Sequence, residues 1–143
     1  MGWLGTCAGL RKLDLDGCLI LTDEALEQLG EASRREDGFE FLNSDNTSDN
    51  RSGSSRGMHQ VGPVPQLQLE ELIISSCFKI TNRGLEKLTR LQHLTYLNCD
   101  FCYQIKEEGL ERLTCLKKLR SLSVSGLHIK EMFSFQLLSI INQ

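Results

Sequence analysis

The sequence predicts an α/β fold in which about four strand–helix units stack into a short solenoid. Two observations predict it. One pattern of apolar, Cys and Gly residues recurs along the chain, and each copy changes from a two-residue to a helical period of apolar residues. Because no single unit of this kind can bury its own apolar face, stacking should create the core, with parallel strands on a concave face and helices on a convex face.

Three segments share the pattern, and they begin at Leu10, Leu69 and Leu94. They read LRKLDLDGCLILTDEALEQL, LEELIISSCFKITNRGLEKL and LTYLNCDFCYQIKEEGLERL. Each has apolar residues at repeat positions 1, 4 and 6, Cys at position 9 and Leu at positions 17 and 20, while position 16 is Gly in two of them and Ala25 in the first. A fourth copy begins at Leu119 as LRSLSVSGL and then departs, as a terminal repeat with only one neighbour should.

Each unit divides into a strand and a helix. The first part, such as LEELII, alternates apolar and polar residues and predicts a short strand with Leu or Ile turned inward. The second part, such as TNRGLEKLTRL over residues 81–91, has apolar residues at helical spacing and predicts the outer helix. Thr22, Thr81 and Asp23 are suitable residues for capping the helix starts.

A polar insertion interrupts the first unit. Leu10 and Leu69 are 59 residues apart, whereas Leu69, Leu94 and Leu119 are spaced by 25. The extra residues are rich in Ser, Asn, Asp, Gly and Arg, a composition that buries too little apolar surface to offset the entropy of ordering. We therefore expect one domain over residues 1–143, with a disordered polar insertion over 30–66.

The shared motif L-x-x-L-x-L-x-x-C-x-x-I-T-D-x-G-L-x-x-L resembles the cysteine-containing leucine-rich repeats of F-box proteins. Here LDLDGCLILTDEAL, LIISSCFKITNRGL and LNCDFCYQIKEEGL carry the resemblance, which covers most of the chain outside residues 30–66. It implies a leucine-rich-repeat solenoid with repeats starting near residues 10, 69, 94 and 119. It also implies a non-enzymatic receptor that holds substrates for SCF-type ubiquitin-dependent degradation, with SCF ligase components as partners through a separate F-box, since no F-box is present in the sequence.

A second resemblance leaves an alternative function open. The segments GLEKLTRLQHLTYL and LRSLSVSGL are similar to short repeat proteins of the mitochondrial ATP synthase factor B type. This resemblance implies a structural or assembly adaptor without any link to a ligase.

Repeat positions 3, 5, 7 and 8 should expose side chains on the concave side, where solenoids usually bind partners. Tyr96, Phe101 and Ile73 beside acidic residues form a predicted group of anchors with a polar surround. The other interpretation is that these are ordinary solvated strand residues. The predicted partner-binding residues are Asp14, Asp16, Glu71, Ile73, Ser75, Tyr96, Asn98, Asp100, Phe101 and Ser123.

The cysteines fit the repeat better than they fit chemistry. Cys99 and Cys102 form C-x-x-C, but a zinc site needs about four ligands and no second pair follows. Cys18, Cys77 and Cys102 all occupy position 9, where we expect a structural ladder of buried thiols. The three histidines are isolated and no phosphate-binding glycine loop is present, so the sequence predicts no catalytic residue, metal site or cofactor.

The composition limits the class of partner and the cellular compartment that we expect. The net charge of −3, with basic residues scattered among acidic ones, argues against nucleic acid. No apolar run approaches the roughly 20 residues that span a bilayer, and the first residues lack the features of a secretory signal. We therefore expect a protein partner and a reducing location, the cytoplasm first, with the nucleus or the mitochondria as alternatives.

Overall fold

The computed structural model describes residues 9–33 and 66–130, together with Phe133, Leu137 and Ser139. In this part of the chain, four strands form one parallel sheet in the order β1-β2-β3-β4. The strands are β1 (Lys12–Asp14), β2 (Glu71–Ile73), β3 (Tyr96–Asn98) and β4 (Ser121–Ser123). The helices are α1 (Asp23–Ala32), α2 (Asn82–Leu88) and α3 (Glu107–Arg112), the last followed by a 3-10 turn, η2 (Leu113–Cys115).

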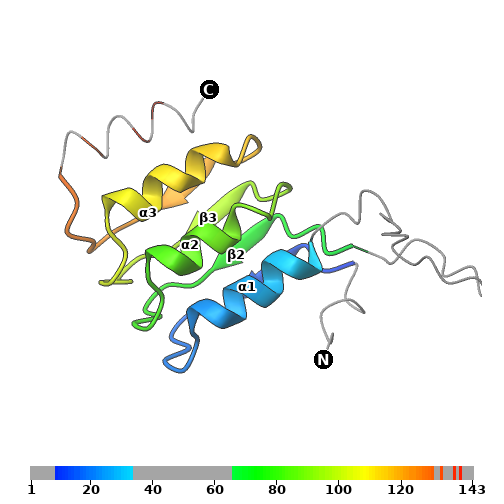
Figure 1. Ribbon diagram of the computed structural model, residues 1–143, viewed down its shortest axis with the longest axis horizontal. Coiled ribbons are helices and arrows are strands. Elements are labelled where there is room, and N and C mark those ends of the chain that lie inside the picture. Colours follow the sequence, from blue (N-terminus) through cyan, green and yellow to red (C-terminus); the bar gives the residue numbers. More distant parts are fainter. Residues whose placement is uncertain (1–8, 34–65, 131–132, 134–136, 138, 140–143) are drawn as a thin grey trace, which may run out of the picture.

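The helices lie side by side in one layer, and the sheet forms the second layer behind them (Figure 1). Strand and helix alternate along the described chain, so each unit adds one strand to the sheet and one helix to the helical layer. The predicted α/β class, with parallel strands on one side and helices on the other, is therefore confirmed. The predicted insertion over 30–66 falls mainly on residues 34–65, which lie outside the described residues, and α1 continues to Ala32.

The sheet follows the repeat alignment residue for residue. Leu13 pairs with Leu72, Leu72 with Leu97, and Leu97 with Leu122, and all four occupy repeat position 4. The extra residues between the first and second units leave this register unchanged. Equivalent side chains of successive units therefore lie in rows across the sheet.

The core lies between the two layers. Its largest part consists of leucines and isoleucines at the repeat positions that the alternation and the helical spacing predicted to be inward. The helical position 17 is fully buried in all three complete units, at Leu26, Leu85 and Leu110. Burial of side chains of this size supplies about 1.5–3 kcal/mol each relative to exposure, which makes these rows the main source of stability.

Every strand ends in a turn with a left-handed residue at repeat position 8. These residues are Gly17, Ser76, Phe101 and Gly126, with φ of 68°, 58°, 59° and 74°. The left-handed region favours glycine because a Cβ approaches the following carbonyl there. Two of the four units nevertheless use a residue with a side chain, and Phe101 is bulky.

The expected helix caps are correct in part. The Thr81 hydroxyl accepts a hydrogen bond from the backbone N–H of Arg83 at 3.2 Å, as a capping residue should. Thr22 precedes α1 but its side chain makes no capping bond. Asp23 does not cap its own helix, because its carboxylate accepts from Thr81 of the next unit instead.

No helix in the described ranges is long and apolar enough to cross a membrane.

Candidate protein-interaction surface

The register brings most of the predicted binding residues onto one face of the sheet. Positions 3 and 5 of each strand point away from the helices, because the leucine between them points into the core. We call this surface the sheet face. It consists of Lys12, Asp14, Glu71, Ile73, Tyr96, Asn98, Ser121 and Ser123.

Asp100 holds two turns together beside the sheet face. Its carboxylate accepts hydrogen bonds from the Ser123 hydroxyl at 2.8 and 2.9 Å and from the backbone N–H of Ser125 at 2.5 Å. The amide oxygen of Asn98 accepts from the backbone N–H of Asp100 at 2.9 Å, which orients the same turn. The carboxylate is therefore occupied by groups of the fold, and Asp100 is a positioning residue more than a free charge for a partner.

Asp16, two units earlier in the chain, makes a similar arrangement. Its carboxylate accepts from the Ser75 hydroxyl at 2.5 Å, and Asp14 accepts from the backbone N–H of Asp16 at 3.0 Å. Ser75 is only 9% exposed. Of the residues predicted to contact a partner, Ser75 therefore offers little surface, and Asp16 joins Asp100 in tying neighbouring units together.

The remaining sheet face combines an apolar centre with charges. Ile73 and Tyr96 are half-buried on adjacent strands. Lys12 and Glu71 form an ion pair at 3.0 Å, and the hydrogen bond and charge of Glu71 raise the pKa of the Lys12 ammonium. Both partners of this pair are largely exposed, so it contributes little stability and its charges remain accessible.

The cysteines of position 9 form a ladder of thiol–carbonyl contacts. The Cys77 thiol donates to the carbonyl of Leu15 at 3.3 Å, and the Cys102 thiol donates to the carbonyl of Ile74 at 3.0 Å. Each thiol thus reaches the position-6 carbonyl of the preceding unit. Cys18, in the first unit, is half-buried.

Burial keeps these thiols protonated. It raises the pKa of Cys77 to about 11 and also raises the pKa of Cys102. Cys99, the other residue of the C-x-x-C pair, is fully buried in the inward position 6, and burial raises its pKa strongly. Since the thiolate is the nucleophile and the metal ligand, this environment suits packing and not chemistry. The described residues contain no group of three side chains able to hold a metal ion.

A second surface, which the sequence prediction missed except for Phe101, lies along the loops that follow the strands. Within the described ranges, every large apolar side chain with high exposure lies in these loops. They are Leu19 (56%), Ile20 (85%), Phe78 (43%), Phe101 (44%) and Tyr103 (53%). Leu19, Phe78 and Tyr103 share repeat position 10, and we call these three the position-10 ladder. Aligning the repeats and reading position 10 downward could have revealed this ladder.

The two aromatic rings of the ladder are stacked, and the ring of Phe101 lies beside them. Phe78 and Tyr103 lie with ring centroids 5.7 Å apart and planes 7° from parallel, and Phe101 meets Tyr103 edge-on at 6.4 Å. The side-chain amide of Gln104 donates to the carbonyl of Phe78, which ties the two loops together. These contacts fix the relative positions of the three rings.

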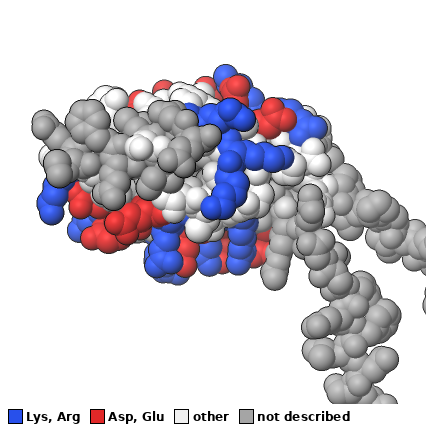
Figure 2. Space-filling view, turned by 90° about the horizontal axis from the view of Figure 1, so that it is seen from above, with Lys and Arg blue, Asp and Glu red and all other residues white. Residues whose placement is uncertain are grey.

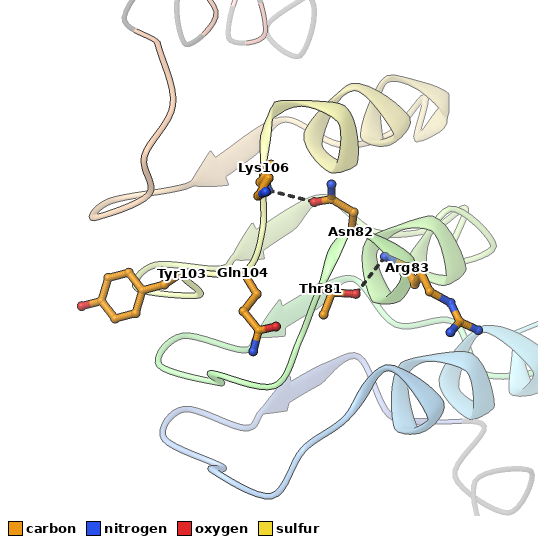
Figure 3. Close-up of a pocket in the computed structure, with 6 residues that line it drawn as sticks. All are labelled: Thr81, Asn82, Arg83, Tyr103, Gln104 and Lys106. Atoms are coloured by element: carbon orange, nitrogen blue, oxygen red, sulfur yellow. Dashed lines mark hydrogen bonds between the residues drawn. The ribbon is translucent and has the colours of Figure 1, made fainter.

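A shallow depression of about 480 Å³ adjoins the ladder, and its lining is Thr81, Asn82, Arg83, Tyr103, Gln104 and Lys106. Figure 3 shows that Tyr103 projects outward from the loop before α3, while Gln104 reaches toward the loop of the preceding unit. The lining contains two cationic side chains and no carboxylate.

Charge pairs cover the helical layer. Lys87 of α2 pairs with Glu27 of α1 at 2.6 Å, and Arg90 pairs with Glu31. The hydrogen bond and charge of Lys87 lower the pKa of Glu27. On the face drawn in Figure 2, basic and acidic side chains lie interspersed and do not separate by sign. Within the described residues, the large apolar side chains of high exposure lie in the loops and not on the helices.

No protein-family model matches the chain, and no curated protein matches it at a significant level. What the chain does must therefore be inferred from its own residues and geometry.

Proposed function

We propose that this chain is a leucine-rich-repeat module that binds a partner protein through the sheet face. One observation carries the proposal. Four strands in a common register place eight side chains of different size and charge on one regular frame, while the residue between them in every strand, at repeat position 4, is Leu. A surface in which the frame repeats and the exposed side chains vary is typical of recognition by solenoid proteins.

The centre of this interface is the pair Ile73 and Tyr96. Both present half-exposed apolar groups on adjacent central strands, with Glu71 and Asp14 next to them. An aromatic and an aliphatic anchor surrounded by polar groups is the usual composition of an energetic hot spot. The Asp16–Ser75 and Asp100–Ser123 hydrogen bonds support the proposal because they hold the neighbouring turns in place before a partner arrives.

A binding function is also supported by the protonation of the buried thiols and by the hydrogen bonds that the carboxylates accept. The buried thiols of Cys77, Cys99 and Cys102 have raised pKa values, and the carboxylates of Asp16 and Asp100 are occupied by serine donors. These free thiols also suit a reducing compartment, for which the cytoplasm is our first proposal.

Substitution of the anchors tests the sheet face. We expect Ile73→Glu and Tyr96→Ala, singly or together, to reduce capture of the partner by at least about tenfold, because loss of a hot-spot anchor removes about 2 kcal/mol or more of binding free energy. The matched control is Glu111→Ala, which changes an exposed residue of α3 on the helical layer. Equal capture by all variants, at equal stability to urea, would remove the sheet face from the proposal.

Within this function, we propose a substrate receptor of the F-box and leucine-rich-repeat kind, acting in SCF-type ubiquitin-dependent degradation. The support is the position-9 cysteine ladder on the repeat spacing that such receptors share. Coprecipitation of the tagged chain with the cullin scaffold of the ligase tests it. Capture of a partner without the scaffold would favour the alternative, an assembly adaptor similar to ATP synthase factor B.

A further inference from the structure

We propose that the position-10 ladder is a second docking surface, which takes an acidic amphipathic helix of a partner protein. It lies at the loop edge and shares no residue with the sheet face, so it goes beyond the binding function proposed above. Three properties of the ladder lead to this occupant: its apolar exposure, the spacing of its rungs and the charge beside it.

The exposed apolar side chains are concentrated at one edge of the molecule. The five most exposed large apolar side chains of the described ranges all lie at this one edge, at repeat positions 8, 10 and 11. Single exposed leucines need no explanation, but a contiguous apolar patch on a small domain indicates an interaction site. Three of the five are aromatic, the residue class most enriched at the centres of protein interfaces.

Contacts within the chain order the two aromatic rungs of the ladder before any partner binds. Phe78 and Tyr103 stack in parallel, and Gln104 bonds one loop to the other. Phe101 has a left-handed backbone with φ of 59°, and its ring contacts the ring of Tyr103 edge-on. The Phe101 ring also lies over Gly126, where a Cβ would approach within 2.5 Å of the ring. A surface that is already ordered loses little entropy on binding.

The spacing of the two aromatic rungs, Phe78 and Tyr103, favours a helix. The centroids of Phe78 and Tyr103 are 5.7 Å apart, close to the ~5.4 Å rise of one α-helical turn. An extended peptide would present side chains on one face about 6.6–6.8 Å apart, and so would lose alignment over successive rungs. A helix lying across the loops can therefore place residues i, i+4 and i+7 on successive rungs, in the helix-in-groove mode of recognition.

The charge beside the ladder selects an acidic helix. Lys79 and Lys106 are exposed and follow the two aromatic rungs closely in sequence. Neither ammonium has an ion-pair partner within the described part of the chain. Two carboxylates at the helix starts accept hydrogen bonds within the chain: Asp23 accepts from Thr81, and Glu107 accepts from the backbone N–H of Lys130.

Selection from a displayed library of random peptides about 16 residues long, roughly four helical turns, tests the occupant. The bait is the full wild-type chain, and the variants are used only to measure affinity afterwards. We expect the enriched peptides to carry apolar residues at i, i+4 and i+7 and an excess of Asp and Glu. A synthetic copy of one should bind at least ~10-fold more weakly to Phe78→Ala/Tyr103→Ala, and several-fold more weakly to Lys79→Glu/Lys106→Glu.

Tyr96→Ala is the matched control, because it changes the sheet face and leaves the ladder intact. Its affinity for the peptide should equal that of the wild type, so failure of the ladder and failure of the sheet face are distinguishable. Lys79→Glu/Lys106→Glu changes only exposed residues, and therefore keeps the test decisive should the aromatic variant fail to fold.

Three outcomes would overturn the proposal. They are no enriched peptide, enriched peptides without an acidic excess, and equal binding to the ladder variants. A fourth contradicting outcome would be binding to a membrane. Cosedimentation of the chain with vesicles of phosphatidylcholine and phosphatidylglycerol that is abolished by Phe78→Ala/Tyr103→Ala would show that the ladder binds a membrane surface, which contradicts the helix.

Discussion

The carboxylate of Asp23 in the first unit accepts two hydrogen bonds from Thr81 in the second, one from the backbone N–H at 2.8 Å and one from the hydroxyl at 2.6 Å. The same link recurs one unit later, where the side-chain oxygen of Asn82 accepts from the backbone N–H of Lys106 at 2.8 Å. These residues lie at the helix starts, so each unit orients the next one through a side chain at repeat position 14.

Removal of this hydrogen-bonded link should weaken the packing of the first unit against the second. We expect Asp23→Ala to lower the free energy of unfolding by about 1–3 kcal/mol, since a part-buried donor loses its acceptor. Asp23→Asn should lose less, because an amide oxygen can still accept from the Thr81 N–H, as Asn82 does for Lys106. Urea denaturation followed by circular dichroism measures both. Equal loss from Ala and Asn would show that the link is electrostatic and not a specific hydrogen bond.

The glycine at repeat position 16 should be needed only where a preceding unit packs against it. A Cβ on Gly84 would approach Leu26 Cδ1 at 3.0 Å and would also meet the Asp23 carboxylate. We expect Gly84→Ala to destabilise the chain by about 1–3 kcal/mol through overpacking, despite the better helix propensity of Ala.

The first unit provides the control for that prediction. Ala25 occupies the equivalent position in α1, with no described unit before it. Ala25→Gly should therefore cost no more than about 1 kcal/mol, the propensity difference alone. A Gly84→Ala chain that is as stable as wild type in thermal melts would contradict the close approach of α1 and α2.

The strand parts of the fold were predictable because one simple rule sets them. The L-x-x-L-x-L pattern gives both the strand and its inward face, and the spacing of the repeats gives the register of Leu13, Leu72, Leu97 and Leu122. The links between units were harder to predict. Asp is a residue type that commonly caps helices, so the sequence suggests that Asp23 caps its own helix. Only the packing of α2 beside α1 makes it an acceptor for Thr81.

The candidate site divides in the same way. The sheet face was predicted from the alternation, and the strand pairing places Ile73 and Tyr96 on adjacent strands in a common register. The sequence could not show that Asp100 is occupied by Ser123, because that hydrogen bond joins different units. Stacking of Phe78 on Tyr103 was equally hidden, since the two rings lie 25 residues apart in the chain and meet only when the loops align.

The left-handed turn at repeat position 8 predicts opposite effects at two equivalent residues. Ser76 has φ of 58°, and Ser76→Gly should stabilise the chain by roughly 0.5–1 kcal/mol, because the relief of backbone strain exceeds the entropy that Gly adds to the unfolded chain. Gly17 has φ of 68° and open space around its Cβ position, so Gly17→Ser should destabilise by about 1 kcal/mol. Chemical denaturation of both variants checks the signs, and the same sign for both would contradict the shared turn.

The buried thiols predict a dependence of stability on pH. Burial raises the pKa of Cys77 from its ordinary value of 9.0 to about 11 in the folded chain. The folded state therefore holds this proton more tightly than the unfolded state does. The resulting stability is fully present below pH 9 and is lost as the pH rises from 9 toward 11.

The variant Cys77→Ala, which lacks the buried thiol, is compared with the wild type. Cys77→Ala should be less stable at neutral pH, because it leaves a gap and removes the contact with the Leu15 carbonyl, but its stability should fall less between pH 9 and pH 11. Labelling with a thiol reagent at neutral pH should modify the exposed Cys115 quickly and Cys77 only after unfolding. Fast labelling of Cys77 in the folded chain would contradict a structural role.

Site-specific photocrosslinking tests partner binding at the sheet face most directly. A benzophenone-bearing phenylalanine analogue is placed at Tyr96 on β3 in one chain and at Glu111 on α3 in another, and adducts formed in cells are compared by gel and mass spectrometry. Partner binding at the sheet face predicts a discrete protein adduct from position 96 that is absent from position 111. Identical adducts from both positions, or adducts from position 111 alone, would contradict it.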